Sequence, residues 1–564
     1  MANLPLSAGL LLALAALPVV PTLFAPFLAD DFLHIDVASR FPASLSSGWV
    51  LPLETAGAWW TPHGLTVEYF RPLVIVFFAI DRLFYGLHPA GYHLTNLLLH
   101  AGTTLLVWGV ARHVLGHGFG AWAAAALFAF HPCHAEAVDW ISGRTDVLAG
   151  VFYAGALLLY LESRIVQRRA ALFLALSLLS FALALLSKEM AITLPAVILL
   201  HACLFPRGET WGRRLLAAAS AGVVAALYLA LRISVLHGIH PPPQPFAFHF
   251  GDPGFFRHLV TAPLLYLVDL VLFILPDPMV TVPFWTAHPL LLAILVAVVA
   301  TVFAGTLRRA PNGRTLAWGL AWMGITLLPV LPLPVGEHFL YLPSMGYCIL
   351  VGSQLPVSAA DVDAPARRGL AWIATGVVVV ALVRTILFDA GAAVANRAVD
   401  ETVAALDRDE SARTVLVVDV PASASLTLPF AVHLARPGRQ VDVGTLSVAP
   451  YLLMGSGPSS SVDYFEPDRL ELRRDQGFLG SYIERAFEGP HAPFRSGQTV
   501  EKSAYTVTVL DAPAGTLHAF LVTLHHPEST LVLRNTGRVL IPLAASSARS
   551  QGPAEPPPPP RTRR

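Results

Sequence analysis

Two adjacent carboxylates, Asp30 and Asp31, follow the first apolar stretch of the chain, residues 5–26. Ionised groups at a membrane boundary are costly unless they face water, a partner or a reaction. Carboxylates in contact repel each other, and the repulsion raises the proton affinity of one of them, which suits it to act as a general base. The pair therefore predicts either a helix end in water or a reaction site, and the motifs further along the chain favour the site.

A second cluster of ionisable side chains lies between two apolar segments: His131, His134, Glu136, Arg144 and Asp146. Holding so many such groups between membrane helices is expensive, so a site is the default hypothesis. In an extended loop Arg144 and Asp146 share one side, where Arg144 offers a bidentate fork to a phosphate or a carboxylate. A zinc site that includes Cys133 is less favoured because a second ligand pair is lacking. The histidines are expected to hydrogen-bond carboxylates and loop carbonyls instead.

Lys188 and Glu189 lie in a tight turn between two apolar segments, and no other lysine precedes position 400. Two interpretations remain open: an ion pair that caps the turn, or a cation beside an anionic leaving group. Arg71 opens another apolar segment, and it either contacts lipid headgroups or orients Asp30 and Asp31.

Two further motifs add candidate residues. Glu337 and Tyr341 belong to a polar turn at residues 336–344, where Tyr341 is either a site residue or an aromatic side chain anchored at the interface. His93, Asn96 and His100 fall on one helical face, at i, i+3 and i+7. They are predicted to be interhelical hydrogen-bond partners in preference to lining the site.

These residues must be positioned by membrane helices, because the 564 residues are 55% hydrophobic and only 13% charged. About eleven spans are predicted. They are residues 5–26, 91–112, 119–138, 146–163, 170–187, 190–205, 213–235, 287–306, 315–333, 342–356 and 370–388. Arginine clusters near 164–169, 207–214, 308–314 and 367–368 are expected in the cytoplasm. The amino terminus then lies inside, and all the polar motifs above lie at the outer face.

Two apolar segments do not fit this count. Residues 73–85 are too short to cross and are predicted to lie along the outer interface. Residues 255–275 are predicted to be re-entrant or in-plane, because basic clusters are absent from their flanks.

Cys133, Cys203 and Cys348 suggest no disulfide framework. Residues 1–26 are interpreted as a retained first span and not a cleaved signal peptide.

Hydropathy falls after residue 388, where a soluble domain is predicted outside the cytoplasm. A helical pattern at 392–411 precedes strand-like runs at 414–420, 440–443, 506–510, 518–523 and 529–533. The proline and arginine residues at 549–564 predict a disordered tail. The domain expectation is therefore a mostly α membrane domain at 1–390, an α+β, β-rich domain at 391–548 and the tail.

The motifs occur in an order that resembles one known group. They are Asp30-Asp31, Tyr69-Phe-Arg71-Pro-Leu, Tyr92 to His100, His131 to Leu148, Lys188-Glu189 and Glu337 to Ser344. Residues 20–390 resemble the TMTC transmembrane O-mannosyltransferases and their bacterial relatives, within the GT-C glycosyltransferases. His338 stands where that group usually has arginine, and the carboxy-terminal domain lacks the group's tetratricopeptide helices.

The resemblance implies a GT-C fold and an inverting glycosyltransferase that acts at the outer face of the membrane. It would move a sugar from a polyprenyl-phosphate donor to a hydroxyl of a protein, glycan or lipid acceptor. The catalytic carboxylate would be Asp30 or Asp31, with Asp30 favoured. Cationic help for the donor phosphate is assigned to Arg71, Arg144 and Lys188. The supporting or acceptor-side residues are His93, His131, His134, Glu136, Asp146, Glu189, Glu337 and Tyr341.

The sequence and the resemblance also bear on the cofactor, the cellular location and the alternative functions. The resemblance leaves open a divalent metal, Mg²⁺ or Mn²⁺, with Asp31 and Asp146 as candidate ligands. The composition, rich in alanine and arginine, points to a bacterial inner membrane. No nucleic-acid partner is predicted. A non-catalytic glycan-binding sensor and a lipid-linked sugar transporter remain as alternatives, although transporters often show repeated halves and midplane charges, and neither is visible here.

Overall fold

The computed structural model describes residues 4–46, 49–52, 55, 57–62, 64–116, 118–207, 210–238, 247–275, 278–309, 312–356, 358, 362–425, 427–449, 460–480, 484, 493–536 and 539–543. The chain divides into two compact units. One comprises residues 1–51 and 66–393, and the other comprises residues 52–65 and 394–564.

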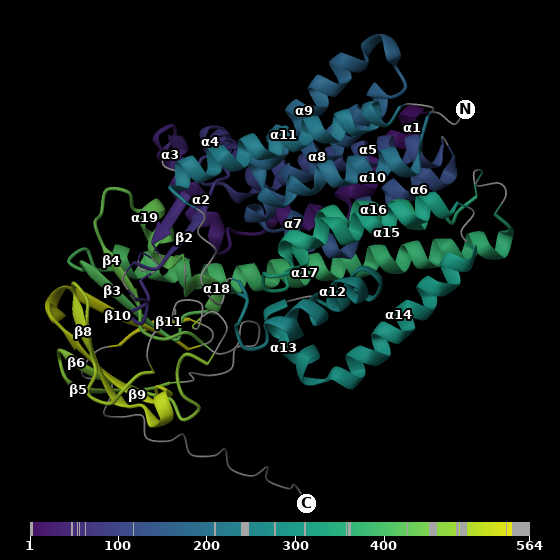
Figure 1. Cartoon of the computed structure of the whole chain (residues 1–564). Coiled ribbons are helices and arrows are strands. Elements are labelled where there is room, and N and C mark those ends of the chain that lie inside the picture. The colour runs from purple at the N-terminus through teal and green to yellow at the C-terminus, as the bar shows by residue number, and fades with distance from the viewer. Residues whose placement is uncertain are drawn as a thin grey trace, which may run out of the picture. The chain divides into compact units, whose positions relative to one another are not determined.

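The first unit is a bundle of helices (Figure 1). Its amino-terminal helices are α1 (Leu4–Ala16), α2 (Asp30–Ser39), α3 (Ala43–Ser46), α4 (Pro72–Tyr85), α5 (Pro89–Leu115), α6 (Phe119–Ala129), α7 (Ala135–Val138), α8 (Arg144–Ser163) and α9 (Ala170–Ser187). They are followed by α10 (Leu194–Leu204), α11 (Trp211–Leu236), α12 (Phe255–Leu272), α13 (Pro278–Ala287), α14 (Pro289–Arg309), α15 (Gly313–Leu327) and α16 (Tyr341–Gly352). Helix α17 (Ala364–Arg408) runs unbroken from the first unit into residues of the second.

Six of the described helices are long and apolar enough to cross a membrane, and four shorter apolar helices accompany them. The protein is therefore an integral membrane protein, while the count of eleven spans stays a prediction. Several predicted boundaries differ from the helix ends, three of them for a clear reason. Helix α1 ends at Ala16 and α6 ends at Ala129, because Pro18 and Pro132 follow and cannot continue a helix. The predicted break between 388 and 392 does not occur within α17.

The two exceptional apolar segments are both helices. Residues 73–85 lie within α4, and α12 is one of the six helices long enough to span. The interpretation of 255–275 as re-entrant or in-plane rested on loop charges, and its length and composition suit a crossing helix equally well.

The polar motifs of the first unit lie in short 3₁₀ turns between helices. These turns are η3 (Pro132–His134), η4 (Ile141–Gly143), η6 (Glu189–Thr193) and η8 (Glu337–Leu340). Turn η4 contacts α2, η8 contacts η3 and α7, and η6 contacts α8. Residues distant in sequence are therefore gathered at the same ends of the helices.

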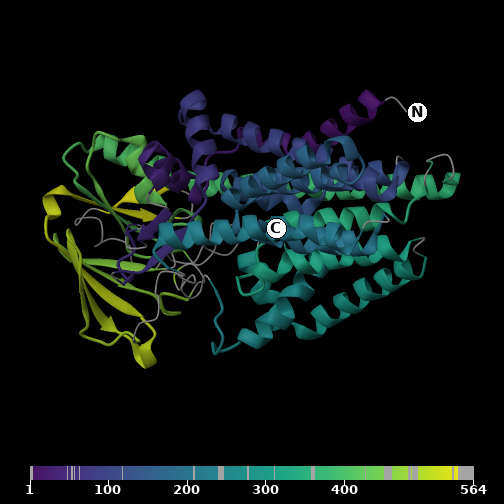
Figure 2. The same cartoon turned by 45° about the horizontal axis from the view of Figure 1, so that its top comes forward.

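The second unit contains two sheets (Figure 2). The first sheet has the order β11-β10-β3-β4, with β3 (Thr414–Val418) parallel to both β4 (Asp442–Thr445) and β10 (Thr530–Asn535), and β11 (Leu540–Pro542) at its edge. Helices α18 (Ala422–Ser425) and α19 (Leu428–Ala435) connect β3 to β4. The second sheet is antiparallel, in the order β5-β6-β9-β8-β7: β5 (Ser461–Glu466), β6 (Arg469–Arg473), β9 (Ala519–Leu524), β8 (Tyr505–Asp511) and β7 (Thr499–Glu501).

The expected α+β character of this region is confirmed, and each of the five predicted runs coincides with a strand. Strands β5, β6, β7 and β11 of these two sheets were not predicted. The predicted tail at 549–564 lies outside the described residues. Residues 52–65, which the sequence analysis assigned to the membrane domain, cluster with the second unit.

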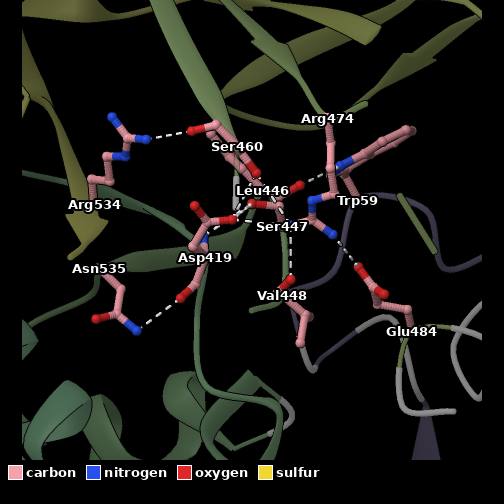
Figure 3. A network of polar contacts seen from close by, with 10 residues as sticks. All are labelled: Trp59, Asp419, Leu446, Ser447, Val448, Ser460, Arg474, Glu484, Arg534 and Asn535. Atoms are coloured by element: carbon pink, nitrogen blue, oxygen red, sulfur yellow. Dashed lines mark hydrogen bonds and ion pairs between the residues drawn. The ribbon is translucent and has the colours of Figure 1, made fainter. Parts of the chain in front are cut away.

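A buried polar network joins the two sheets of the second unit (Figure 3). Asp419, which directly follows β3, accepts hydrogen bonds from Ser447, Ser460 and Arg474 through Oδ1 at 3.0, 2.7 and 3.0 Å. The Arg474 guanidinium follows β6 and also lies 3.5 Å from Glu484. Side chains from both sheets therefore meet at the carboxyl end of β3.

Candidate active site

Asp30 and Asp31 open helix α2, and the structure gives them different surroundings. Asp31 is 1% exposed, and its carboxylate accepts hydrogen bonds from the Ser142 amide at 2.8 Å, the Ser142 hydroxyl at 2.6 Å and the Leu28 amide at 2.8 Å. Asp30 is partly exposed, and no described residue donates a hydrogen bond to its carboxylate. Asp31 thus fastens α2 to turn η4, whereas the carboxylate of Asp30 remains available.

Both carboxyl groups hold protons more tightly than usual. Burial raises the pKa of Asp30 to about 6, although the charges of Arg71 and His338 act in the opposite direction. Burial likewise raises the pKa of Asp31 to about 7, against the hydrogen bonds from Ser142 and Leu28. A carboxylate with a pKa near 6 is ionised at neutral pH yet basic enough to accept a proton. The electrostatics therefore suit Asp30 to general-base chemistry.

The backbone immediately before Asp30 is strained. Ala29, the residue before α2, has a φ of 48°, a left-handed conformation that the β-carbon of a non-glycine residue disfavours. Strain of this kind persists only where the surrounding structure imposes it, and it clusters at functional sites. The Leu28 amide is held by Asp31 and the Leu28 carbonyl by the Trp140 indole, at 2.8 and 3.2 Å, so both neighbouring segments fix the turn.

Arg71 lies at the start of α4 and binds Glu189 through two hydrogen bonds, of 3.1 and 2.6 Å. Its guanidinium also lies 4.4 Å above the ring of Tyr69. The Arg71 side chain is 12% exposed, whereas that of Glu189 is 39% exposed. Arg71 is therefore fixed in place, and its partner is the more accessible member of the pair.

Lys188 and Asp146 form a buried ion pair, with Nζ 2.7 and 2.6 Å from the two carboxylate oxygens. The ammonium also lies 4.8 Å from the centre of the Phe339 ring. Because both side chains are almost fully buried, this pair ties turn η6 to α8.

Arg144 is entirely buried, with an exposure of 0%. Its guanidinium pairs with Asp81 at 2.6 Å, donates to Asn96 at 2.8 Å and to the Tyr92 carbonyl at 2.8 Å, and stacks over Phe78. These contacts occupy the fork that the sequence analysis assigned to a phosphate. In this structure Arg144 joins α4, α5 and α8.

The turn at residues 336–344 is held by two carboxylates. Glu136 accepts a hydrogen bond from the His338 amide at 2.9 Å and lies 3.0 Å from the His338 ring. Glu337 pairs with Arg384 of α17 at 2.5 Å. The position that usually carries arginine in the resembled group thus contributes a histidine that faces Glu136.

The predicted histidines and Tyr341 lie in the interior. His131 contacts the Leu270 carbonyl at 3.2 Å, and His134 contacts the Ser344 hydroxyl at 2.8 Å. The Tyr341 hydroxyl lies 3.0 Å from His100. His93 is likewise buried on α5. Asn96 and His100 form the predicted hydrogen bonds to other helices and turns, whereas the ring nitrogens of His93 have no hydrogen-bond partner among the described residues.

The candidate metal ligands do not fit an ion in this arrangement. Asp31 uses both oxygens on the Ser142 and Leu28 donors, and Asp146 uses both on Lys188. In the described part of the chain no group of three or more histidine, cysteine, aspartate or glutamate side chains is arranged to hold a metal. No reaction step is therefore derived through Mg²⁺ or Mn²⁺.

The structure thus brings Asp30, Arg71, Glu189, Glu136 and His338 to the partly exposed part of the site and buries the other candidates. Sequence reasoning missed Arg384 and Asp81. A single arginine inside the predicted span 370–388, and a single aspartate inside the segment 73–85, were available signals, because such groups need a buried partner.

Comparisons with known proteins give several relatives. No family model matches the chain. Protein O-mannosyl-transferase Tmtc1 of Drosophila melanogaster is 39% identical over 198 residues, which cover 34% of this chain and 22% of that protein. Protein O-mannosyl-transferase TMTC3 of Mus musculus is 29% identical over 375 residues, which cover 58% of this chain and 40% of that protein. The chain therefore spans well under two thirds of these relatives.

The structural neighbours are more distant. The oligosaccharyltransferase of Archaeoglobus fulgidus has a TM-score of 0.41 at 13% identity, covering 80% of this chain and 65% of that one. ArnT of Cupriavidus metallidurans, solved with undecaprenyl phosphate, has a TM-score of 0.39 at 16% identity, covering 75% and 76%. This chain therefore resembles the TMTC protein O-mannosyl-transferases, over 34% of its length in the match to Tmtc1 and over 58% in the match to TMTC3.

Proposed function

We propose that the protein is an inverting glycosyltransferase that moves a sugar from a polyprenyl-phosphate donor to a hydroxyl group at the non-cytoplasmic face of the membrane. Asp30 carries this proposal. It is a partly exposed carboxylate with a raised pKa, at a strained helix start, beside a neighbour that is fully engaged in structural hydrogen bonds. The names of the sequence relatives support the reaction class.

In the proposed reaction, Asp30 accepts the proton of the acceptor hydroxyl. The acceptor oxygen attacks the anomeric carbon from the side opposite the phosphate, forming the new glycosidic bond with inversion. The bond between the anomeric carbon and the phosphate oxygen breaks, and the polyprenyl phosphate leaves with that electron pair. Arg71 stabilises the charge that develops on the phosphate, because a guanidinium fork binds a phosphate as well as a carboxylate.

In this proposal the other two cationic side chains, Lys188 and Arg144, hold the site in shape and do not bind the phosphate. Lys188 holds Asp146, and Arg144 holds Asp81, so both act as positioning residues that fix turns η6 and η4. The acceptor is a protein or an envelope glycan, and the membrane is a bacterial inner membrane with the carboxy-terminal domain outside the cytoplasm.

The test compares Asp30→Asn with Asp31→Asn in the full-length protein. Transfer of radiolabelled sugar from polyprenyl-phosphate donors is measured in membranes, alongside thermal unfolding in detergent. Asp30→Asn should lower kcat roughly 10²- to 10⁴-fold, the usual contribution of a general base, and should not lower the unfolding temperature. Asp31→Asn should lower the unfolding temperature. Full activity in Asp30→Asn would end the base assignment.

A further inference from the structure

The segment that links the two accessible site residues folds as part of the other unit. The chain leaves the first unit after Leu51 and re-enters it at Thr66. Helix α2, with Asp30 at its start, precedes this excursion, and Arg71 follows it closely. Strands β1 (Trp49–Pro52) and β2 (Thr66–Tyr69) pair in a two-stranded sheet that forms the stem of the excursion. We call residues 57–60, at the far end of this stem, the anchor.

The anchor adds an edge to the four-stranded sheet of the second unit. The Thr445 amide donates a hydrogen bond of 2.8 Å to the Gly57 carbonyl, and Ala58 forms a parallel bridge with Thr445. Strand β4 lies at the end of the sheet order, so its outer side would otherwise expose unpaired backbone groups. The anchor satisfies part of that edge.

Two tryptophans bury the anchor. Trp59 is 1% exposed and Trp60 is 4% exposed. The Trp59 indole donates to the Leu446 carbonyl at 3.0 Å, and the Trp60 indole donates to the Glu484 carbonyl at 3.0 Å. The Trp59 ring also packs against Phe520, with ring centres 5.0 Å apart. Because each indole is both buried and hydrogen-bonded, the anchor is held in one orientation.

Glycine is required at one position of the anchor. Gly57 has a φ of +80°, and a β-carbon there would lie 2.3 Å from the Val443 carbonyl oxygen, which belongs to the backbone of β4 and has no freedom to move aside. Gly64 has a φ of +78°, yet a β-carbon there would meet nothing within 4 Å. Alanine would therefore strain the backbone at both positions, because both have a positive φ. Only at Gly57 would its β-carbon also collide with a neighbouring backbone atom.

The stem connects the anchor to the proposed phosphate-binding arginine. Tyr69 is the last residue of β2, and its ring lies 4.4 Å from the Arg71 guanidinium. Helix α4, which Arg71 opens, packs on α2 through the stacked rings of His34 and Phe78, 4.8 Å apart. A displacement of β2 would therefore move Tyr69 and Arg71 relative to the helix that carries Asp30.

We propose that the anchor lets the carboxy-terminal unit position Arg71 through the intervening strand, and that Gly57 and Trp59 are positioning residues of the transfer site. The effect on transfer rests on the proposed function, whereas the mechanical coupling does not.

The test uses full-length Gly57→Ala, with Gly64→Ala as the matched control, in detergent or nanodiscs. Hydrogen exchange of residues 66–75 reports the coupling without any assay of activity. Gly57→Ala should speed exchange in this segment at least tenfold, whereas Gly64→Ala should leave it unchanged. In transfer assays Gly57→Ala should lower kcat/KM on the order of 10- to 100-fold, mainly through the KM for donor, because small displacements of a positioning group are costly.

A second variant covers the case in which Gly57→Ala does not fold. Trp59→Phe keeps an aromatic ring but loses the hydrogen bond to Leu446, and it should produce a smaller change of the same kind, with Trp59→Ala larger. Faster exchange confined to residues 52–65 and β4, with residues 66–75 and donor KM unchanged, would overturn the proposal. If Asp30→Asn retains transfer activity, the proposed function fails, and the exchange measurement still decides the coupling.

Discussion

The ion pair between Arg474 and its two carboxylates gives a sharp prediction for the carboxy-terminal unit. The Arg474 side chain is 6% exposed, and those of Asp419 and Glu484 are 3% and 2% exposed. Arg474→Met keeps most of the apolar stem but removes the cation from between two buried carboxylates. Breaking a buried pair by removing one partner costs about 3–5 kcal/mol. For a unit of this size each kcal/mol lowers the unfolding temperature by roughly 2–4 °C, so a fall of roughly 6–20 °C is expected.

The measurement is thermal unfolding of the full-length protein, with hydrogen exchange of β3 and β6 to assign the transition to this unit. Arg469→Met is the matched control, because the Arg469 side chain is 50% exposed and lies 3.7 Å from Glu466, which is 59% exposed. An exposed pair contributes at most about 1 kcal/mol. Unfolding of Arg474→Met within error of Arg469→Met would refute the reasoning.

A double variant separates lost charge balance from lost packing. Asp419 has a φ of 56°, a conformation that asparagine also tolerates, so Asp419→Asn removes charge without adding backbone strain. Combined with Arg474→Met, it should recover part of the lost stability, because one buried charge is removed with its counter-ion. A double variant less stable than either single variant would show that the hydrogen bonds outweigh the charge balance.

Four further predictions concern the site. Because burial raises the pKa of Asp30 to about 6, kcat/KM should fall as pH drops through 6 and level off above it; a flat profile between pH 5 and 8 would contradict this. The same raised pKa values mean that the folded state binds more protons between pH 4 and 7, so the stability contribution of Asp30 and Asp31 should be lost as pH rises through that window in calorimetry. Glu189→Gln should lower the donor KM several-fold, because Glu189 competes for the Arg71 fork; a raised KM at unchanged kcat would count against it. Lys188→Met should cost about 3–5 kcal/mol in thermal unfolding by stranding Asp146, with partial recovery on adding Asp146→Asn.

Strands β3 and β8 were predicted because their buried faces are apolar. Strand β3 is buried along its whole length, and β8 alternates between more and less buried positions, so both leave a hydropathy signal. Strand β5 is largely exposed along Ser461–Glu466 and presents no apolar period. It pairs with β6 in a hairpin across Pro467 and Asp468, so the signal that was missed is the local turn and not a distant contact.

The candidate site was predictable as a set of motifs but not as a set of partners. The spacing of residues 131–146 identified a polar turn, and the structure shows this turn fastened by Asp31 through Ser142. Which cation pairs with which carboxylate depends on how helices pack. Arg144 pairs with Asp81 and Glu337 with Arg384, from segments far apart in the sequence. The sequence assigned Arg144 to the donor phosphate, whereas in the structure its buried guanidinium is occupied by Asp81, Asn96 and the Tyr92 carbonyl.

Charge balance explains why only a few of the ionisable groups are left for chemistry. A charge taken out of water is stabilised only by a close counter-ion with further hydrogen bonds, so a membrane bundle must pair its interior ions. The buried pairs in the described part of the first unit are Arg144–Asp81, Lys188–Asp146 and Arg384–Glu337. Each is consumed in joining helices, and none can exchange its partner without stranding a buried charge. The pair of Arg71 and Glu189 is different, because its carboxylate is 39% exposed and can return to water when a phosphate takes its place. Under the proposed function the chemistry therefore falls to Arg71 and Asp30, while the partly exposed pair of Glu136 and His338 completes the accessible part of the site.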